Sequence, residues 1–134
     1  VHVFPGKSVV LKECAHIGHG AIIHGGKIGN NTLIGMNSVV MDDAMVGDEC
    51  IVGALCFIKA EMKIPNRKLI VGNPAIIKGD ISDEMMDWKS DGTKIYQELL
   101  RECIETLKGC QPLREIPKER PPQKINFKPW KETK

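Results

Sequence analysis

Three of the four histidines in this 134-residue chain lie in the stretch HIGHGAIIH, which spans residues 16–24. They are His16, His19 and His24, and the fourth, His2, stands near the N-terminus. Imidazole nitrogens bind divalent metal ions, and a neutral imidazole can also act as a general base. The cluster therefore allows three interpretations: metal ligation, base catalysis, or surface histidines without a chemical role. The choice depends on the elements that position these side chains.

A six-residue repeat runs through this part of the chain, with one repeat that is a residue short. Its second position is glycine in five of eight repeats, and its fifth position is usually a small residue. Its first position is always a β-branched aliphatic residue: Ile17, Ile23, Ile28, Ile34, Val40, Val46, Val52 and Ile58. A period of six matches neither a simple strand nor a helix. It predicts a coil with three flat sides, each a short strand, and about 18 residues in a turn.

The predicted fold is mainly β, a left-handed parallel β-helix of hexapeptide repeats; its handedness is taken from resemblance to hexapeptide proteins. The first and fifth positions should point inward, so Cys50 and Cys56 are interpreted as packing residues. Glycine should supply the unusual backbone at the corners. We expect the β-helix to cover residues 1–79, with a loop or bulge at 58–68 and a closing segment at 69–79.

A C-terminal helical segment, residues 80–110, is expected to pack on the flank of the coil. Ser82 suits an N-cap, and a second helix is expected from about Thr93 to Lys108 because its apolar residues form one stripe. Residues 111–134 are rich in proline and lysine and predict an extended or disordered tail, with Trp130 as a candidate anchor.

Composition excludes several classes of function. The net charge of +2 gives no argument for nucleic acid or membrane partners, and no apolar run is long enough for a membrane span. Five cysteines without a CxxC motif argue against a disulfide framework, so we expect a reducing, cytoplasmic location. Because the chain begins with Val1 inside an expected strand, we expect that an N-terminal segment is missing.

The repeat separates the histidines. His24 holds the second position of its repeat, and His2 holds the same position if Val1 is a first position. The 22 residues between Val1 and Ile23 equal one turn of about 18 plus four, which the Pro-Gly turn at 4–7 could loop out. His2 and His24 should then lie one rung apart, where they could share a metal ion.

His19 should lie around a corner, on another face, and could reach that pair only from a neighbouring subunit in a threefold assembly. Three imidazoles and a water form the open tetrahedral site of catalytic zinc, and the same donors suit Co(II) or Fe(II). Exposed polar residues are nevertheless ordinary at these repeat positions. His16 needs no role, although it or Glu13 could contact a metal ligand or the substrate.

The stretch HIGHGAIIHG, with His2 seventeen residues before His19, resembles the γ-class carbonic anhydrase family of trimeric left-handed β-helices. The segments IGMNSVVMD (34–42), IVGALCFIKA (51–60) and LIVGNPAIIKG (69–79) resemble the CaiE and PaaY branch of that family. The resemblance implies that His2, His19 and His24 bind the metal, with His19 given by the adjacent subunit of a homotrimer. The arginine, aspartate and glutamine of the family's upstream coils are not among these residues, and FPGKSVV replaces its acidic loop.

The resemblance implies a zinc, iron or cobalt ion whose bound hydroxide attacks a small carbonyl, either CO2 or an acyl-CoA thioester. Two alternatives remain at this stage. The first is CoA-dependent acyl transfer, in which His16 or His19 acts as a general base without a metal. The second is a non-catalytic accessory protein or a truncated, inactive remnant.

Overall fold

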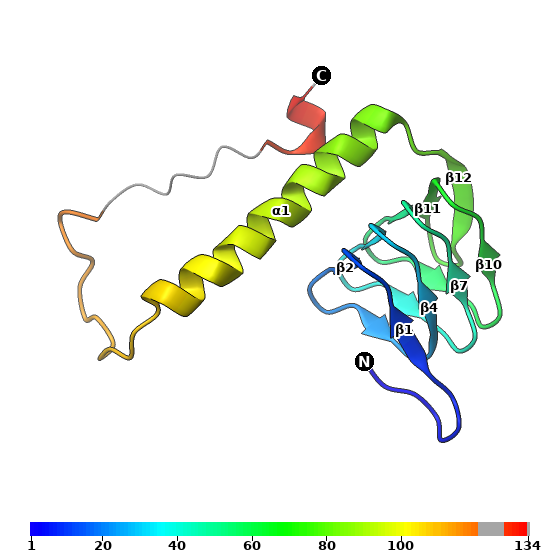
Figure 1. The fold of residues 1–134 in the computed structure, drawn as a ribbon, viewed down its shortest axis with the longest axis horizontal. Helices are drawn as coiled ribbons and strands as arrows, with labels where there is room; N and C mark the ends of the chain where they lie inside the picture. The colour runs from blue at the N-terminus through cyan, green and yellow to red at the C-terminus, as the bar shows by residue number, and fades with distance from the viewer. Residues whose placement is uncertain (121–127, 134) are drawn as a thin grey trace. The chain divides into compact units, whose positions relative to one another are not determined.

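The computed structural model describes residues 1–120 and 128–133, and the chain divides into two compact units, Val1–Ser90 and Asp91–Lys134. The first unit is a coil of very short strands, which Figure 1 shows stacked one behind the next. Almost every strand pairs with the strand one turn further along the chain, and these pairings are parallel. The predicted parallel β-helix of hexapeptide repeats is therefore confirmed.

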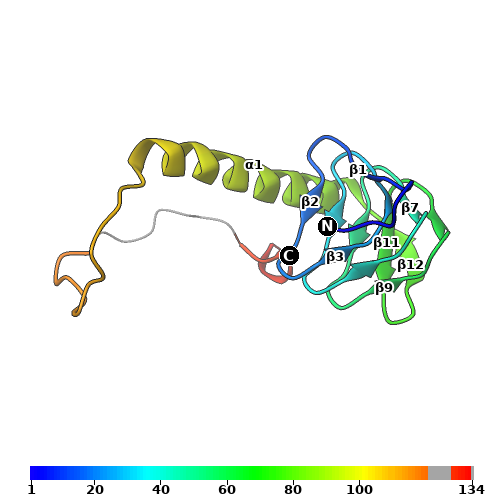
Figure 2. The same ribbon diagram turned by 90° about the horizontal axis from the view of Figure 1, so that it is seen from below.

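Three sheets form the three sides of this coil. Sheet A contains β1 (Val9–Leu11), β4 (Gly26–Ile28), β7 (Met45–Val46) and β10 (Lys63–Ile64). Sheet B contains β2 (His16–Ile17), β5 (Leu33–Ile34), β8 (Ile51–Val52), β11 (Lys68–Val71) and β12 (Ile76–Asp80). Sheet C contains β3 (Ile22–Ile23), β6 (Val39–Val40) and β9 (Phe57–Ile58). Figure 2 shows the same coil after a quarter turn.

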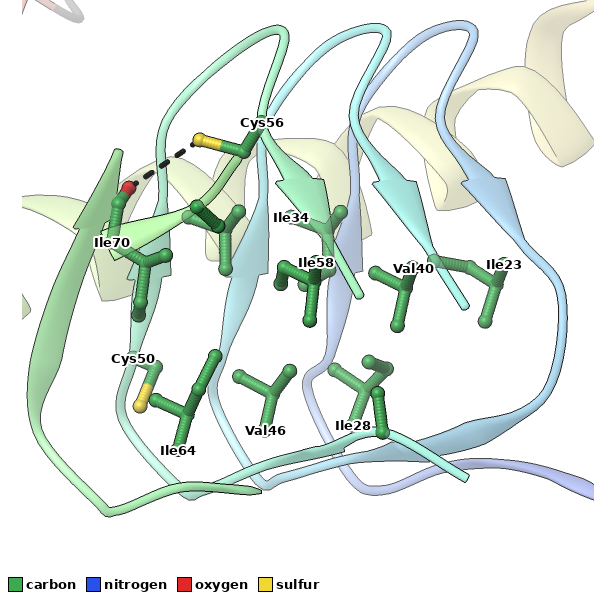
Figure 3. Packing of buried hydrophobic residues seen from close by; sticks show 13 residues of the cluster. Ile23, Ile28, Ile34, Val40, Val46, Cys50, Cys56, Ile58, Ile64 and Ile70 are labelled. Carbon is green, nitrogen blue, oxygen red and sulfur yellow. Dashed lines mark hydrogen bonds between the residues drawn. The ribbon is translucent and has the colours of Figure 1, made fainter. Parts of the chain in front are cut away.

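The first position of each repeat forms the core. Figure 3 shows these aliphatic side chains pointing into the coil and stacked from turn to turn. Nearly all of them are fully buried, including Ile23, Ile34, Val40 and Ile58, each 0% exposed. Burial of such side chains contributes about 1.5–3 kcal/mol each to stability. Repetition of one aliphatic residue at each side therefore builds a continuous core from strands of only two residues.

The fifth position carries a ladder of buried polar atoms. The hydroxyl of Thr32 donates to the carbonyl of Gly47 at 2.7 Å and accepts from the amide of Cys50 at 3.0 Å. Ser38 repeats both bonds with Gly53 and Cys56. Cys50 and Cys56 occupy the same slot one turn further on, and burial raises the pKa of both thiols. Their interpretation as packing residues agrees with this position.

The corners do not depend on glycine in the expected way. A left-handed backbone recurs at the fourth position, which Gly20 occupies in one repeat and residues other than glycine occupy in the later repeats: Asn31, Asn37, Asp43, Glu49, Leu55, Glu61 and Arg67. The second-position glycines have ordinary backbone angles but no room for a side chain. A Cβ at Gly29 would lie 2.3 Å from the carbonyl oxygen of Gly47 in the next turn. The expectation that these glycines supply the unusual corner backbone is therefore wrong.

Residues 58–68 are another turn of the coil, and the predicted loop or bulge is wrong. The strand β10 pairs in parallel with β7, and Ile64 is buried at the first position. The repeat is hard to recognise here because Pro65 stands where glycine is usual. The next segment does change direction, since β12 pairs antiparallel with β11 as a hairpin.

A single helix, α1 (Asp83–Thr106), replaces the two expected helices. The hydroxyl of Ser82 accepts the amide of Met85 at 3.2 Å, which confirms the predicted N-cap. The Ser-Asp-Gly stretch at 90–92 does not end the helix, because one glycine costs a helix only about 1 kcal/mol.

The first turns of α1 pack on the outer face of sheet B. Met85 and Met86, with Ile81, cover the outward side chains of three strands: Leu33, Ile51 and Leu69. The predicted packing of the C-terminal helix on the flank is thus present for this first part of the helix. It makes sheet B the covered side of the coil.

A buried lysine fastens this part of the helix to the coil. Lys89 is 3% exposed, and its ammonium donates to the carbonyl of Cys14 at 3.1 Å and to Oδ1 of Asn31 at 2.6 Å. The amide of Asn31 donates in turn to the hydroxyl of Ser90 at 2.9 Å. Burial lowers the pKa of Lys89 to about 8. The charged form is therefore less favoured here than in water.

The second unit contains the rest of α1 and the tail. Several apolar side chains of the expected stripe are exposed in this chain, among them Leu100, Ile104 and Leu107. Residues 111–120 contain no helix or strand, and Trp130 opens a short 3-10 helix, η1 (Trp130–Glu132). The remainder of the predicted tail, 121–127 and 134, lies outside the described residues. No helix in the part of the chain that the structure describes is long and apolar enough to cross a membrane.

Because successive turns lie so close together, one methyl group added at a second-position glycine should destabilise the fold. We expect Gly35→Ala to lower the free energy of unfolding by about 1–3 kcal/mol, because overpacking of that size is typical of a well-packed interior. The added Cβ would lie 2.5 Å from the amide nitrogen of Ala54. Gly79→Ala is the control, since no atom lies within 4 Å of its Cβ. Urea unfolding of both variants checks the prediction; equal midpoints would contradict it.

The lowered pKa of Lys89 predicts a rise in stability with pH. The unfolded chain keeps the lysine proton up to its ordinary pKa, whereas the folded chain releases it from about pH 8. The unfolded state then binds more protons between these two values, so unfolding becomes less favourable as pH rises. We expect the stability of the natural protein to rise relative to Lys89→Met across this window. The buried cysteine thiols contribute equally to the pH dependence of both proteins, so their contribution drops out of the difference in stability.

Candidate functional site

The histidines and the other candidate residues occupy different corners of the coil. His2 and His24 lie at the corner between sheets C and A, and His19 lies at the corner between sheets B and C. Glu13 lies at the third corner, between sheets A and B, where its carbonyl accepts the amide of Asn31. His16 begins β2 on sheet B. Only His2 and His24 are brought together within one chain.

The expected proximity of His2 and His24 is found. Nδ1 of His2 lies 3.2 Å from Nε2 of His24, and the two ring centroids are 5.2 Å apart. The amide of His2 donates to the carbonyl of Ile23 at 3.0 Å, which holds this residue beside the first position of the repeat. Residues 22 apart in the chain thus lie side by side, as the register of the repeats predicts.

Residues 4–7, the four that exceed one turn of the coil, form a turn beside the histidine pair. Lys7 donates its amide to the carbonyl of Phe4 at 3.1 Å, and its ammonium pairs with Asp43 at 2.6 Å. The ring of Phe4 meets the ring of His24 edge-on, with centroids 5.0 Å apart. Phe4 nevertheless remains 59% exposed. An accessible aromatic surface therefore borders the histidine pair.

A carboxylate behind His24 was missed by the sequence reasoning. Oδ2 of Asp42 lies 3.1 Å from Nδ1 of His24, on the side of the ring opposite to His2. The two residues are 18 apart, which is one full turn of the coil. Counting one turn forward from His24 would therefore have found Asp42.

The donor set fits a divalent metal ion. Two ligand nitrogens on one tetrahedral zinc lie about 3.3–3.4 Å apart when each bond is about 2.0–2.1 Å long. The nitrogens of His2 and His24 are 3.2 Å apart. A carboxylate that accepts the remaining N–H of a ligating histidine is also typical of metal sites in proteins. His2 and His24 could thus supply two ligands of such a site, with Asp42 behind one of them.

A single chain does not complete the site. In residues 1–120 and 128–133 no three His, Cys, Asp or Glu side chains are grouped closely enough to hold a metal ion. His19 is exposed at its own corner, where its carbonyl accepts the amide of Asn37 at 2.9 Å. The expectation that His19 joins the pair from a neighbouring subunit stays a prediction.

His16 has a different environment. It is half-buried on sheet B, directly in register with Leu33, and burial lowers its pKa, with the charges of Lys89 and His19 acting in the same direction. A depressed pKa keeps the ring neutral at pH 7. The structure thus places His16 on the helix-covered side, and it places neither His16 nor Glu13 with His2 and His24.

The outward faces of the three sheets differ in chemistry. Sheet B is covered by α1, and sheet A presents Lys27, Met45 and Lys63 in register. Sheet C presents an apolar ladder of Ile22, Val39 and Phe57 in register. Ile22 is 52% exposed, and no helix of the unit 1–90 covers this face. Sheet C is also the side that lies between the His19 corner and the corner of His2 and His24.

Known proteins resemble this chain in its repeat and along most of its length. A family model described as bacterial transferase hexapeptide (six repeats) matches residues 25–60. The carnitine operon protein CaiE of Citrobacter koseri is 44% identical over 121 residues, which cover 90% of this chain and 61% of the relative. The chain thus spans about three-fifths of the length of this curated relative.

Solved structures share the fold. A perosamine N-acetyltransferase from Caulobacter crescentus, in complex with CoA and GDP-perosamine, is 29% identical with a TM-score of 0.51. The match covers 54% of this chain and 34% of that enzyme. A hexapeptide transferase family protein from Anaplasma phagocytophilum has a TM-score of 0.58 at 17% identity, covering 74% of this chain and 95% of that one.

Proposed function

Because the chain belongs to the hexapeptide-repeat family and resembles CaiE over 90% of its length, we propose that it is a metalloenzyme of the γ-class carbonic anhydrase type, with its metal ion between subunits. The observation that carries this proposal is the pair of imidazole nitrogens 3.2 Å apart, with a carboxylate behind one of them. In this proposal His2 and His24 hold a zinc, iron or cobalt ion together with His19 of the partner subunit.

The shape of the coil supports a homotrimer. When three triangular prisms meet with one side of each toward a threefold axis, each prism touches its neighbours at the two edges of that side. Sheet C is an apolar side on which Ile22 is exposed and Val39 and Phe57 are half-buried, and its two edges carry His19 and the His2–His24 pair. This head-to-tail contact closes into a ring and brings the two half-sites together.

The proposed reaction is attack on a small carbonyl group. A divalent ion in this site would lower the pKa of a bound water toward about 7 and so supply a hydroxide nucleophile. The chain's own residues hold the ion and shape its surroundings. The exposed ring of Phe4 beside His24 offers an apolar surface to an acyl group. We therefore place an acyl-CoA thioester ahead of CO2 as the substrate.

A second candidate is CoA-dependent acyl transfer. The likeness to a perosamine N-acetyltransferase that binds CoA favours it. In this reading His19 is the general base in a cleft between subunits, and no metal is needed. A third candidate is a non-catalytic accessory protein. Metal content separates the first candidate from the other two.

We expect about one metal ion per chain after reconstitution with Zn²⁺, Co²⁺ or anaerobic Fe²⁺, and we expect His19→Ala to lose it, because two imidazoles alone bind divalent ions weakly. Metal analysis after gel filtration measures the ratio. A wild-type protein that holds no metal but binds acetyl-CoA would support acyl transfer instead. CO2 hydration and hydrolysis of a hydroxyphenylacetyl-CoA, assayed side by side on the natural full-length protein, then identify the substrate.

Sites divided between subunits should complement one another. His19→Ala and His24→Ala should each bind no metal alone. After unfolding and refolding together in equal amounts, about a quarter of the sites should be restored, because random cyclic assembly places an intact donor beside an intact acceptor at that frequency. Metal content of the mixture checks this expectation. Recovery of no sites, with trimers present, would contradict a shared site.

The apolar ladder predicts which substitution dissociates the oligomer. Ile22→Lys places a charge on sheet C, and we expect it to yield monomers, because an unpaired charge in a buried interface is strongly unfavourable. Met45→Lys, on the exposed sheet A, is the matched control and should remain trimeric. Light scattering after size-exclusion chromatography measures both. A trimeric Ile22→Lys protein would place the interface elsewhere.

A further inference from the structure

We infer that Asp42 is a positioning residue that fixes the tautomer of His24 and thereby selects Nε2 as the nitrogen that His24 presents to His2. The inference deepens the proposed metal site and rests on it for its purpose. The tautomer itself, however, is a property of the polypeptide alone and can be measured without a metal.

The direction of the hydrogen bonds follows from the carboxylate. An ionised carboxylate only accepts hydrogen bonds, so at 3.1 Å from Oδ2 of Asp42 the Nδ1 atom of His24 must carry the proton. A neutral imidazole then has its lone pair on Nε2, which faces Nδ1 of His2 at 3.2 Å. In this pair His2 donates and His24 accepts. His24 is therefore held with its metal-binding nitrogen free of a proton.

The burial of Asp42 indicates that this role has a cost. Its side chain is 19% exposed, and among the described residues its second oxygen, Oδ1, is buried without a hydrogen-bond partner. A buried oxygen without a partner destabilises a fold, so such an atom in a native structure requires an explanation, of which a functional role is one. The orientation of His24 would account for a carboxylate at this position in spite of its effect on stability.

The backbone next to His24 leaves room for the carboxylate. Gly25 has a φ of +108°, and a Cβ there would lie 2.9 Å from Oδ1 of Asp42. A side chain at this position would displace the carboxylate from beneath the imidazole. The absence of a side chain at Gly25, in the short repeat at 23–27, therefore makes space for Asp42 of the next turn.

Asp43 provides the matched control. It is the next residue in the chain and carries the same charge, but its carboxylate pairs with Lys7 at 2.6 Å in an exposed setting. A general effect of negative charge near the corner would appear in both Asp42→Asn and Asp43→Asn. A tautomer effect would appear only in the first.

The first measurement is the nitrogen-15 NMR spectrum of the histidine rings in the metal-free full chain. We expect His24 to be protonated at Nδ1 in the wild type and in Asp43→Asn. In Asp42→Asn the side-chain amide can donate as well as accept, so we expect the Nε2-protonated form to appear, and in Asp42→Ala to dominate. A wild-type His24 protonated at Nε2, or a tautomer unchanged by Asp42→Ala, would overturn the inference.

The second measurement is Co²⁺ affinity by competition with a chelator. We expect Asp42→Ala to bind Co²⁺ about 10–100-fold more weakly, because loss of a carboxylate partner of a ligating histidine has an effect of that size. Asp43→Asn should bind as the wild type does, and circular dichroism confirms that all variants are folded. Equal affinity in wild type and Asp42→Ala would overturn the inference while the metal site stands. A wild type that binds no Co²⁺ would overturn the proposed function, and the NMR result then decides the tautomer by itself.

Discussion

The fixed distance between neighbouring turns of the coil governs the rest of this structure. Parallel main-chain hydrogen bonds hold successive strands about 4.8 Å apart, and every turn repeats the same path. Second-position glycines exist because a Cβ there would meet the backbone of the next turn. The hydroxyl of Thr32 reaches the carbonyl of Gly47 and the amide of Cys50 because both lie one spacing away. His2, His24 and Asp42 form a column for the same reason.

One chain thereby acquires three sides with different tasks. The side formed by sheet B receives the helix, and Lys89 and Asn31 secure it through polar contacts. The side formed by sheet A presents lysines to solvent. The side formed by sheet C carries an apolar ladder, Ile22, Val39 and Phe57, that no helix of the unit 1–90 covers. The candidate metal ligands lie at the corners, where side chains are not needed for the core.

The sequence predicts the repetitive parts of this protein well and the exceptions poorly. The aliphatic first position identifies the coil, and its register predicts that His2 meets His24. The same register fails at 58–68, because Pro65 obscures a turn that Ile64 still defines. The corner backbone was assigned to glycine, although Asn, Asp, Glu, Leu and Arg adopt it. Asp42 was missed because it belongs to the site through the next turn and not through neighbours in the chain. In the proposed trimer the imidazole of His19 would meet the other two histidines only through a second molecule.

The turn at residues 4–7 has a consequence for how such a site can change. It leads from His2 to β1, while the bond between the amide of His2 and the carbonyl of Ile23 holds His2 in place, and its four extra residues leave the register of the turns unaltered. Longer or shorter turns could therefore be exchanged at this corner while both imidazoles keep their places. The molecule separates a constant pair of imidazoles from a variable rim. A loop grafted at this corner would therefore change the surface beside the two histidines on an unchanged scaffold.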